Sequence, residues 1–420
     1  MLDIKFIREH EDEVRQNCLN RQARVDFAKL LELDKAKHAL MLEIQTLREE
    51  RNKKSKTKPT DEEIAKMKEV GDSIQTKEGE MKAIDDVMWP LLLAVPNMTH
   101  PDVKISDDEN DNQVLEQFGQ PTRFNFEPLD HVQLAENLDL LDLERGAKVA
   151  GTKFYYLKNE LALLELALVN YAMDIIVKRG YIPLITPDLA KTDIVERMGF
   201  NPRGEATQVY QIQDSDLSLI GTAEITLGGY HADEALNAED LPLRYVAMSH
   251  CFRTEAGSYS KFSKGLYRVH QFTKVEMFIY CSPEDSEKLH EEILEIEKDI
   301  WQGLDLPFRV IDHSSADLGN PSYRTFDLEV WLPGKPAQDD SLGDWAEVTS
   351  CSNCTDYQAR GLNTKIKNAD GTRNLAHTLN GTGIATSRAL IAILENYQEA
   401  NGTVKVPKVL QKYLNFKIIK

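Results

Sequence analysis

The sequence predicts an α+β protein in which a helical arm precedes a larger body that contains antiparallel strands. Two long stretches of the first hundred residues carry apolar side chains at alternating spacings of three and four, as helices of a coiled coil do. Farther along, residues 243–255 and 266–280 have the pattern of two strands joined by a loop with glycine. A long apolar helix precedes them, so both helices and strands are expected in the body.

The arm is expected to be an antiparallel pair of helices with its tip near residues 51–60. Pro59 breaks the pattern there, and Thr60 with Glu63 forms a capping-box pattern that opens the second helix. Helices of about 27 residues would extend roughly 40 Å. A short helix over residues 3–17 is expected before them. The seam residues are Leu30, Leu33, Leu40, Ile44 and Leu47, with Lys37 filling one step, and then Ile64, Met67, Ile74, Met81, Ile84, Met88 and Leu91.

The tip carries an unusual concentration of positive charge for so acidic a protein. The chain has a formal net charge of -19, yet the run RNKKSKTKPT contains no acidic residue. The first hundred residues hold 18 basic and 20 acidic side chains, so most of the negative charge lies in the body. Such a run is either a solvated loop or a contact for a polyanion, because clustered lysine and arginine displace counterions from phosphates.

The composition, the prolines and an acidic linker segment indicate a cytoplasmic protein of two domains. Prolines 90, 96 and 101 are expected to end the arm, and the acidic segment SDDENDNQ has the composition of a linker, which places the boundary near residue 105. The expected domains are residues 1–105 and 106–420. The N-terminus does not have the pattern of a signal peptide, and no run is apolar enough to span a bilayer. The five cysteines suggest no disulfide framework, which favours a reducing cytoplasm.

The apolar helix of the body begins near residue 158 and ends at Lys178, Arg179 and Gly180. The segment YIPLITPDL follows, extended and interrupted by Pro183 and Pro187, and prolines of this kind are confined to edge strands and strand ends. Either this helix and strand form a subunit interface, or they are a core helix beside a loop. The pattern alone leaves both interpretations open.

The two predicted strands carry charged and aromatic residues on one face. The first ends with Arg253 and Glu255, and an alternation of two places Arg268, His270, Phe272, Lys274 and Glu276 together on the second. Charged side chains in a core need partners, so this face is difficult to explain as core. It is typical of a binding surface for an anion, a ring and an amine.

Several short motifs in a fixed order resemble the class II aminoacyl-tRNA synthetases. FRTE at 252–255, followed by a loop and RVHQF at 268–272, resembles their motif 2; GYIPLITP at 180–187 resembles motif 1, and GTGIATSR at 381–388 resembles motif 3. The whole set is similar to seryl-tRNA synthetase in particular. It adds TAE at 222–224, HQFTKVE at 270–276, FDLEVWLPG at 326–334, SCSNC at 350–354 and LNGTG at 379–383. The resemblance covers nearly the whole chain, including the arm.

The resemblance implies a fold, a reaction and partners. The body would be a class II catalytic core, a mostly antiparallel sheet flanked by helices. The chain would activate L-serine with ATP and Mg²⁺ and transfer it to tRNA(Ser), and also to tRNA(Sec), as a homodimer without membrane contact. The helical arm of the protein would bind the long variable arm of the tRNA. An amino-acid-activating relative that loads another acceptor, or a non-catalytic regulator, is the alternative. The presence of the arm disfavours a relative that loads another acceptor. The presence of Arg253, Glu347 and Arg388 disfavours a non-catalytic regulator.

The resemblance also implies a role for particular residues. Arg253 would hold the α-phosphate and the serine carboxylate, Arg388 the γ-phosphate, and Glu347 with Ser350 the Mg²⁺; Arg253, Arg388 and Glu347 form the catalytic set. Cys351 and Cys354 suggest zinc, but a structural site needs four ligands and the sequence has no second pair of this spacing, so no zinc is expected. The implied ATP-binding residues are Arg253, Thr254, Glu255, Phe272, Glu347, Val348, Thr349, Ser350 and Arg388. The serine-binding residues are Thr222, Ala223, Glu224, Glu276, Asn380 and Thr382, and the tRNA-binding residues are Arg51, Lys53, Lys54, Lys56 and Lys58.

Overall fold

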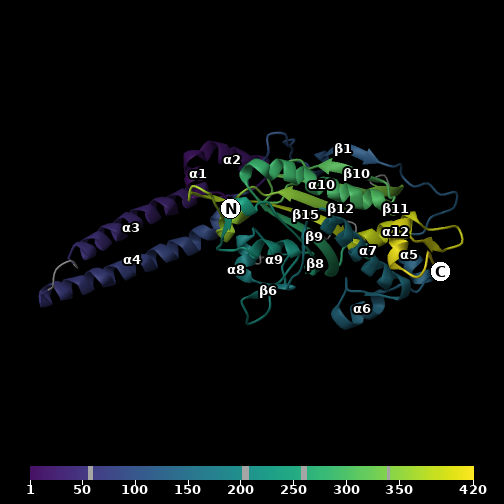
Figure 1. The fold of residues 1–420 in the computed structure, drawn as a ribbon, viewed down its shortest axis with the longest axis horizontal. Coiled ribbons are helices and arrows are strands. Elements are labelled where there is room, and N and C mark those ends of the chain that lie inside the picture. The colour runs from purple at the N-terminus through teal and green to yellow at the C-terminus, as the bar shows by residue number, and fades with distance from the viewer. Residues whose placement is uncertain (55–59, 201–207, 257–262, 338–340) are drawn as a thin grey trace. The chain divides into compact units, whose positions relative to one another are not determined.

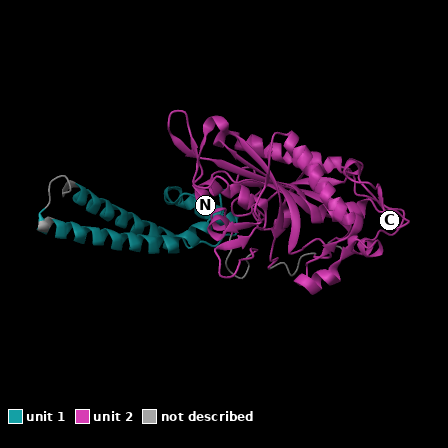
Figure 2. Cartoon of the chain, turned by 60° about the horizontal axis from the view of Figure 1, so that its bottom comes forward, with its two compact units in different colours: residues 1–98 teal, residues 99–420 magenta. Residues whose placement is uncertain are grey.

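The computed structural model describes residues 1–54, 60–200, 208–256, 263–337 and 341–420. The chain divides into two compact units, Met1–Met98 and Thr99–Lys420 (Figure 2). The predicted domain boundary near residue 105 stays a prediction. Figure 1 gives the order of the elements, which combine long helices with a large sheet, and so the α+β prediction is confirmed.

The first unit begins with two short helices, where the sequence predicted one over residues 3–17. They are α1 (Ile4–Glu9), capped by the side chain of Asp3, and α2 (Glu11–Asn20). His10 lies between them with φ -125° and ψ 39°, outside the helical region, and this ends α1. Three acidic residues in the first turn of α2 then favour a new helix start at that point.

The arm consists of α3 (Phe27–Lys54) and α4 (Asp61–Leu93), which pack against each other. Seam residues such as Leu30, Ile44 and Ile74 are buried. Lys37, which interrupts the apolar seam, forms an ion pair with Asp85 on α4, with 2.6 Å between Nζ and Oδ1. The side chain of Glu63, the predicted capping partner, lies outside the described residues.

Helix α4 continues through Pro90, although this proline was expected to end the arm. A proline inside a helix removes one backbone hydrogen bond and can be tolerated with a local distortion. Only one further turn follows, in which the N–H of Ala94 donates to the carbonyl of Pro90 at 3.1 Å. The helix then ends at Leu93.

An eight-stranded sheet forms the centre of the second unit, in the order β1-β10-β11-β12-β15-β9-β8-β4. Every neighbouring pair is antiparallel except β4 and β8, which are parallel. The strands are β1 (Gln113–Phe118), β4 (Ile182–Ile185), β8 (Leu243–Phe252), β9 (Gln271–Cys281), β10 (Phe308–Asp312), β11 (Arg324–Pro336), β12 (Leu342–Asn353) and β15 (His377–Ala385). Smaller sheets contain β2 (Leu141–Asp142), β3 (Tyr156–Leu157), β5 (Leu189–Lys191), β6 (Leu217–Leu219), β7 (Ala235–Asn237), β13 (Lys365–Lys367), β14 (Arg373–Leu375), β16 (Val404–Lys405) and β17 (Ile418–Ile419).

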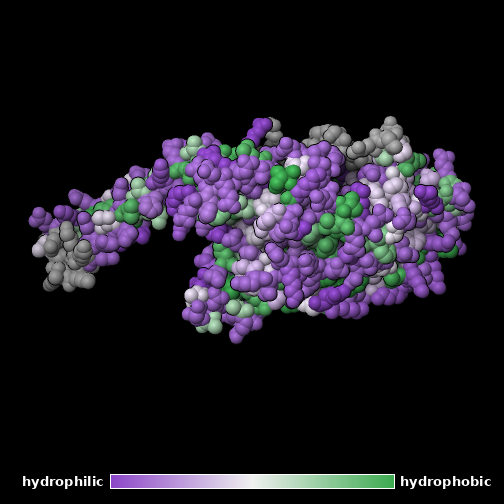
Figure 3. Space-filling model, turned by 90° about the horizontal axis from the view of Figure 1, so that it is seen from above, coloured by the Kyte–Doolittle hydropathy of each residue, from purple (hydrophilic) through white to green (hydrophobic). Residues whose placement is uncertain are grey.

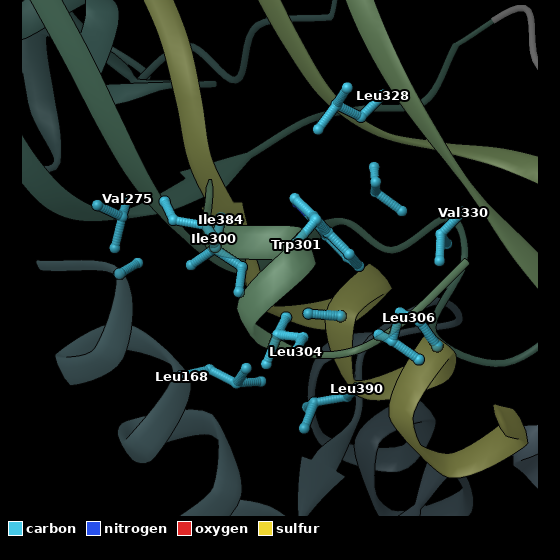
Figure 4. Packing of buried hydrophobic residues seen from close by; sticks show 14 of the residues in the cluster. Leu168, Val275, Ile300, Trp301, Leu304, Leu306, Leu328, Val330, Ile384 and Leu390 are labelled. Atoms are coloured by element: carbon cyan, nitrogen blue, oxygen red, sulfur yellow. The ribbon is translucent and has the colours of Figure 1, made fainter. Parts of the chain in front are cut away.

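Helices cover the central sheet on both faces. The larger core lies between one face and three helices, α7 (Asn159–Lys178), α10 (Ser286–Gly303) and α12 (Thr386–Asn396). Figure 4 shows part of this core, where Trp301 of α10 lies among Leu304, Leu306 and Leu390. The remaining α-helices in the described ranges are α5 (His131–Asn137), α6 (Leu143–Ala150), α8 (Thr192–Arg197), α9 (Ala223–Gly229) and α11 (Tyr357–Leu362). Helices α8, α9 and α11 contribute to a smaller core.

Strand β9 separates the two cores by the alternation of its side chains. Val275, Met277 and Ile279 belong to the larger core, whereas Phe278 and Tyr280 belong to the smaller one beside α9. Because side chains two apart share a face of a strand, the face of Phe278 also presents the residues before it at even positions. The buried cores therefore fix the direction in which this strand displays its polar residues.

The predicted edge strand is confirmed, since β4 lies at the end of the sheet beside β8. Gly180 adopts φ +89°, a left-handed conformation that favours glycine, between the end of α7 and β4. One side of α7 is buried, but its residue Leu166 points outward and is 61% exposed. On β4, Ile185 is 94% exposed. The helix α7 is thus a core helix beside an edge strand, and the subunit-interface interpretation stays a prediction.

On the face in Figure 3, hydrophilic residues predominate and hydrophobic ones form small separate groups. Across the described ranges of the chain, none of the helices combines the length and apolar character needed to cross a membrane.

Candidate active site

A cavity of about 620 Å³ opens on the sheet face that carries the even-numbered residues of β9. Most of the residues singled out from the sequence line it, although they come from segments more than a hundred residues apart. They are Thr222, Glu224, Arg253, Glu255, Phe272, Glu276, Glu347, Val348, Thr349, Ser350, Asn380, Thr382 and Arg388. Ala223 and Thr254 do not line it: Ala223 is buried in the smaller core, and the backbone N–H of Thr254 donates to the carbonyl of Gln208 at 3.2 Å.

Of the five residues predicted to share a face on the second strand, three do so. Phe272, Lys274 and Glu276 project from β9 into the cavity. Arg268 and His270 precede the strand, which begins at Gln271, and their place on it was wrong. The backbone N–H of Arg253 donates to the carbonyl of His270, and the side-chain Nδ1 of His270 lies 2.9 Å from the carbonyl of Arg253. These two contacts close the hairpin without continuing the sheet.

One end of the cavity is a network of buried carboxylate and amide groups. Thr222 caps α9 by accepting the N–H of Glu224 at 3.1 Å, which directs this glutamate inward. Glu224 Oε1 accepts hydrogen bonds from Gln358 Nε2 at 2.7 Å and from Asn380 Nδ2 at 3.0 Å. Burial raises the pKa of Glu224, while the bond from Gln358 opposes the rise. Gln358 was not foreseen, because it lies on a helix in the sequence QAR with no motif of its own.

Strand register places a second buried carboxylate beside this network. Thr382 of β15 lies directly opposite Glu276 of β9, and a bulge follows at Gly383. A Cβ at Gly383 would lie 2.6 Å from Ile176 Cδ1, so a larger residue there would have to displace this side chain. Glu276 contacts the ammonium group of Lys274, and both side chains are buried. Burial raises the pKa of Glu276 to about 7, against the lowering effect of Lys274.

The other end of the cavity combines cations with an aromatic ring. The guanidinium of Arg253 lies 5.3 Å from the ring centre of Phe272, and its Nε donates to the carbonyl of Gly221 at 3.3 Å. Glu255 follows with a left-handed φ of +51° and accepts a hydrogen bond from Arg268 Nη1 at 3.0 Å. A ring next to a fork of donors suits a planar base attached to an anion.

A second arginine closes this end from the helix α12. Arg388 Nη1 donates to the backbone carbonyl of Glu347 at 2.5 Å and lies 3.2 Å from its carboxylate. Its guanidinium also stacks over Tyr267, 5.0 Å from the ring centre. Partial desolvation would raise the pKa of Glu347, but the positive charges of Arg388, His313 and Arg253 outweigh it and hold the pKa below its usual range. Glu347 is therefore a charged oxygen donor at neutral pH.

Known proteins resemble this chain along its whole length. A family profile described as "Seryl-tRNA synthetase N-terminal domain" matches residues 1–99, and one described as "tRNA synthetase class II core domain (G, H, P, S and T)" matches residues 208–397. A curated serine–tRNA ligase of Treponema denticola is 49% identical over 99% of both chains. The chain belongs to the seryl-tRNA synthetase family.

Other members of the seryl-tRNA synthetase family agree with this assignment. A serine–tRNA ligase of Dictyoglomus thermophilum is 48% identical over 100% of this chain and 99% of its own. Among solved structures, a seryl-tRNA synthetase from Pyrococcus horikoshii in complex with ATP has a TM-score of 0.87 at 39% identity, covering 100% of this chain and 99% of its own. The cytoplasmic enzyme of Naegleria fowleri in complex with AMP has a TM-score of 0.84 at 32% identity, with the same coverage.

The synthetase cavity also contains a histidine that the sequence did not single out. His313 follows β10, and its Nε2 lies 2.9 Å from Asp327 Oδ2 while its Nδ1 lies 3.4 Å from Asp317 Oδ2. Burial alone would lower the pKa of His313, but the two carboxylates raise it to about 10. The imidazole is thus a buried cation. Asp327 belongs to the motif FDLEVW, but no local pattern in the sequence connects it to His313, fourteen residues earlier.

The two cysteines of SCSNC lie on different sides of the synthetase sheet. Cys351 belongs to the larger core, whereas Cys354 lines the cavity and accepts a hydrogen bond from Asn380 Nδ2 at 3.6 Å. Burial raises the pKa of both thiols. Within the described ranges, no three histidine, cysteine, aspartate or glutamate side chains are grouped as ligands for one metal ion.

The basic run of the synthetase is described only in part. Arg51 is exposed near the end of α3. Lys53 and Lys54 belong to the same helix, but their side chains lie outside the described residues. Lys56 and Lys58 lie outside the described residues altogether.

Proposed function

We propose that this chain is a serine–tRNA ligase: it joins serine to ATP as seryl-adenylate with release of pyrophosphate, and then transfers the seryl group to the 3′ end of tRNA(Ser). The observation that carries the proposal is one cavity with a buried carboxylate–amide network at one end and two arginines with an aromatic ring at the other. Membership of a family whose curated relatives are serine–tRNA ligases supports it.

The first step needs no nucleophile from the protein. A carboxylate oxygen of serine attacks the α-phosphorus, and the bond to the pyrophosphate oxygen breaks. Arg253 would hold the α-phosphate and the serine carboxylate, because its planar fork of donors suits two oxygens at once. Catalysis of this kind rests on positioning and on fixed positive charge where negative charge develops. In the second step a hydroxyl of the tRNA 3′ end attacks the carbonyl carbon, and AMP leaves.

ATP would occupy the end of the cavity that holds the arginines. Phe272 offers a ring face to the adenine, and Glu255 would accept from the adenine amino group. Arg388 would contact the γ-phosphate, close to the start of α12. Val348 and Thr349 would support this end from β12, and Thr254 from the segment that follows β8. The Pyrococcus horikoshii relative was solved with ATP, which supports the assignment.

The donors present also fit Mg²⁺. The carboxylate of Glu347 and the hydroxyl of Ser350 both line the cavity and are hard oxygen donors. This ion commonly takes one or two protein oxygens and completes its shell with waters and substrate phosphates, so a two-residue set suffices. When bound, it would neutralise charge on the phosphates. A Glu347 carboxylate that holds the ion would no longer pair with Arg388. The guanidinium of Arg388 would then be available to the γ-phosphate.

Serine would occupy the buried end. Glu224 and Thr222 would hold its ammonium group, with Ala223 placing them at the start of α9. Glu276 and Thr382 would bind its hydroxyl, while Asn380 fixes Glu224. A site built to bind a hydroxyl rejects an analogue without one, since its own polar groups are left unpaired. Alanine should be a poor substrate for this reason, and threonine should be excluded by its extra methyl group.

The proposed acceptor is tRNA, held by the arm through Arg51, Lys53, Lys54, Lys56 and Lys58. The match of residues 1–99 to a seryl-tRNA synthetase N-terminal domain supports this over a relative that loads another acceptor. Transfer to tRNA(Sec) is part of the same proposal. The exposed apolar side chains of α7 and β4 support a homodimer, in which the arm of one subunit serves the active site of the other.

Amino-acid-dependent exchange of pyrophosphate into ATP tests the proposal. We expect exchange with serine and nearly none with alanine, threonine or glycine, followed by charging of tRNA(Ser) transcripts. Equal exchange with alanine would show that the buried end does not recognise the hydroxyl. Serine-dependent exchange without tRNA charging would favour a relative that loads another acceptor.

A further inference from the structure

A buried histidine–glutamate pair lies outside the cavity, under the end of the loop that follows β8. His131 is the first residue of α5, and Glu395 lies near the end of α12; both are almost fully buried. His131 Nδ1 is 2.8 Å from Glu395 Oε1. Neither residue lines the cavity. The pair therefore connects two helices without a direct role in binding.

The hydrogen bonds of the pair fix which nitrogen of the imidazole carries hydrogen. Glu395 Oε1 also accepts the backbone N–H of His131 at 3.1 Å, and its Oε2 accepts that of Gly334 at 2.8 Å. A carboxylate with these donors around it only accepts, so His131 Nδ1 donates to it. Nε2 is then an acceptor, and the backbone N–H of Leu266 donates to it at 3.3 Å.

The backbone at Gly265 packs very closely against the start of α5. Gly265 adopts φ +56°, and a Cβ built on it would lie 2.3 Å from His131 Nε2 and 2.5 Å from Val132 Cγ2. Any other residue would push the imidazole away. Lys264 adds an ion pair to Asp130, the residue that caps α5. Consecutive residues at the end of the loop are thus bound by the first residues of one short helix.

The next two residues belong to the cavity. Tyr267 lies under the guanidinium of Arg388, and Arg268 pairs with Glu255. Arg388 and Glu395 share the helix α12. The helix that carries Arg388 therefore also holds, through Glu395 and His131, the segment on which the guanidinium of Arg388 rests.

We propose that His131 is a positioning residue for ATP: by accepting the N–H of Leu266 it sets Tyr267 and Arg268 against Arg388 and Glu255. This rests on the proposed function. The imidazole of His131 makes no contact with the substrate in this role. Loss of the acceptor should weaken ATP binding and leave serine binding unchanged, because the serine end of the cavity is built from other segments.

Two conservative replacements separate this role from simple packing. In His131→Asn the amide can still donate to Glu395 from the position of Nδ1, but it cannot reach Leu266. In His131→Gln the amide oxygen can accept the N–H of Leu266 from the position of Nε2. We expect the KM for ATP in pyrophosphate exchange to rise roughly three- to tenfold in His131→Asn, the value of one neutral hydrogen bond, and to stay within about twofold in His131→Gln. The KM for serine should not change in either.

A glycine pair gives an independent test should either variant fold poorly. Gly265→Ala introduces the clash with His131, whereas Gly371→Ala has a similarly positive φ of +84° but open space around it. We expect the KM for ATP to rise in the first and not in the second. Equal KM values for ATP in His131→Asn and His131→Gln, or in the two glycine variants, would overturn the proposal. A parent chain without serine-dependent exchange would instead overturn the proposed function.

Discussion

Replacing Glu276 by glutamine tests whether a buried charge recognises the hydroxyl of serine. Glu276 is 1% exposed, contacts Lys274 and faces Thr382 across the sheet. Glutamine has nearly the same shape and keeps one carbonyl acceptor for Lys274. The substitution therefore removes the negative charge of the acceptor at nearly constant shape, and Lys274 loses its charged partner.

The magnitude follows from the type of hydrogen bond. A bond to a charged group contributes about 1.5–3 kcal/mol and one between neutral groups about 0.5–1.5 kcal/mol, so the change should cost about 1–1.5 kcal/mol. This corresponds to a loss of roughly five- to tenfold in kcat/KM for serine. Alanine has no hydroxyl, so its residual exchange should be unchanged, and the preference for serine should fall by the same factor.

The pH dependence gives a second signature. Because burial raises the pKa of Glu276 to about 7, the carboxyl group is neutral below that pH and charged above it. In the parent, kcat/KM for serine should rise between about pH 6 and about pH 8, since this quantity reports groups of the free enzyme. In Glu276→Gln this rise should disappear.

The assay is pyrophosphate exchange with serine and alanine across that pH range, with the KM for ATP and the melting temperature as controls. An equal loss for serine and alanine would refute the reasoning, because it would show a general disturbance of the cavity. A pH profile that is the same in parent and variant would refute the assignment of the charge.

Three further predictions concern other parts of the molecule. Arg388→Lys should raise the KM for ATP about tenfold or more and leave the KM for serine unchanged, because an ammonium cannot contact Tyr267, Glu347 and a phosphate as a guanidinium does; equal KM values for ATP would contradict this. Leu166→Glu should shift the protein from dimer to monomer in light scattering, since this exposed leucine would lie in the proposed interface; an unchanged mass would exclude α7 from it. Glutamine at all five basic positions of the tip should leave exchange unchanged, raise the KM for tRNA and lower its salt dependence by a little under one unit for each lost phosphate contact; unchanged tRNA kinetics would identify a solvated loop. Those positions are Arg51, Lys53, Lys54, Lys56 and Lys58.

The parts of the fold that depend on local patterns were predictable from the sequence. The apolar seams of α3 and α4 and the alternation in β9 each reflect one element burying one face, which needs no knowledge of distant segments. Local signals were less reliable where two of them competed. His10 interrupts a helix that its neighbours favour, and Pro90 lies within one because a single remaining turn costs little.

Contacts that depend on register or on distant segments could not be predicted. Thr382 meets Glu276 only because β15 pairs with β9 in one register and bulges at Gly383. His131 meets Glu395 across 264 residues of sequence, and no spacing rule connects them. The resemblance to the family supplied most of the cavity residues, but it did not supply Gln358 or His313, which act on those residues and carry no motif.

Strand β9 imposes different tolerances on two kinds of genetic change. Substitutions at Phe272, Lys274 and Glu276 alter the cavity and leave both cores untouched, so these positions can change substrate preference without changing the packing of the strand. A deletion or insertion of one residue inside Gln271–Cys281 would exchange the two faces, and would turn Lys274 and Glu276 into the core while Val275 and Met277 faced the substrate. Libraries that seek new amino acid substrates should therefore keep the length of this strand fixed and vary only Phe272, Lys274 and Glu276.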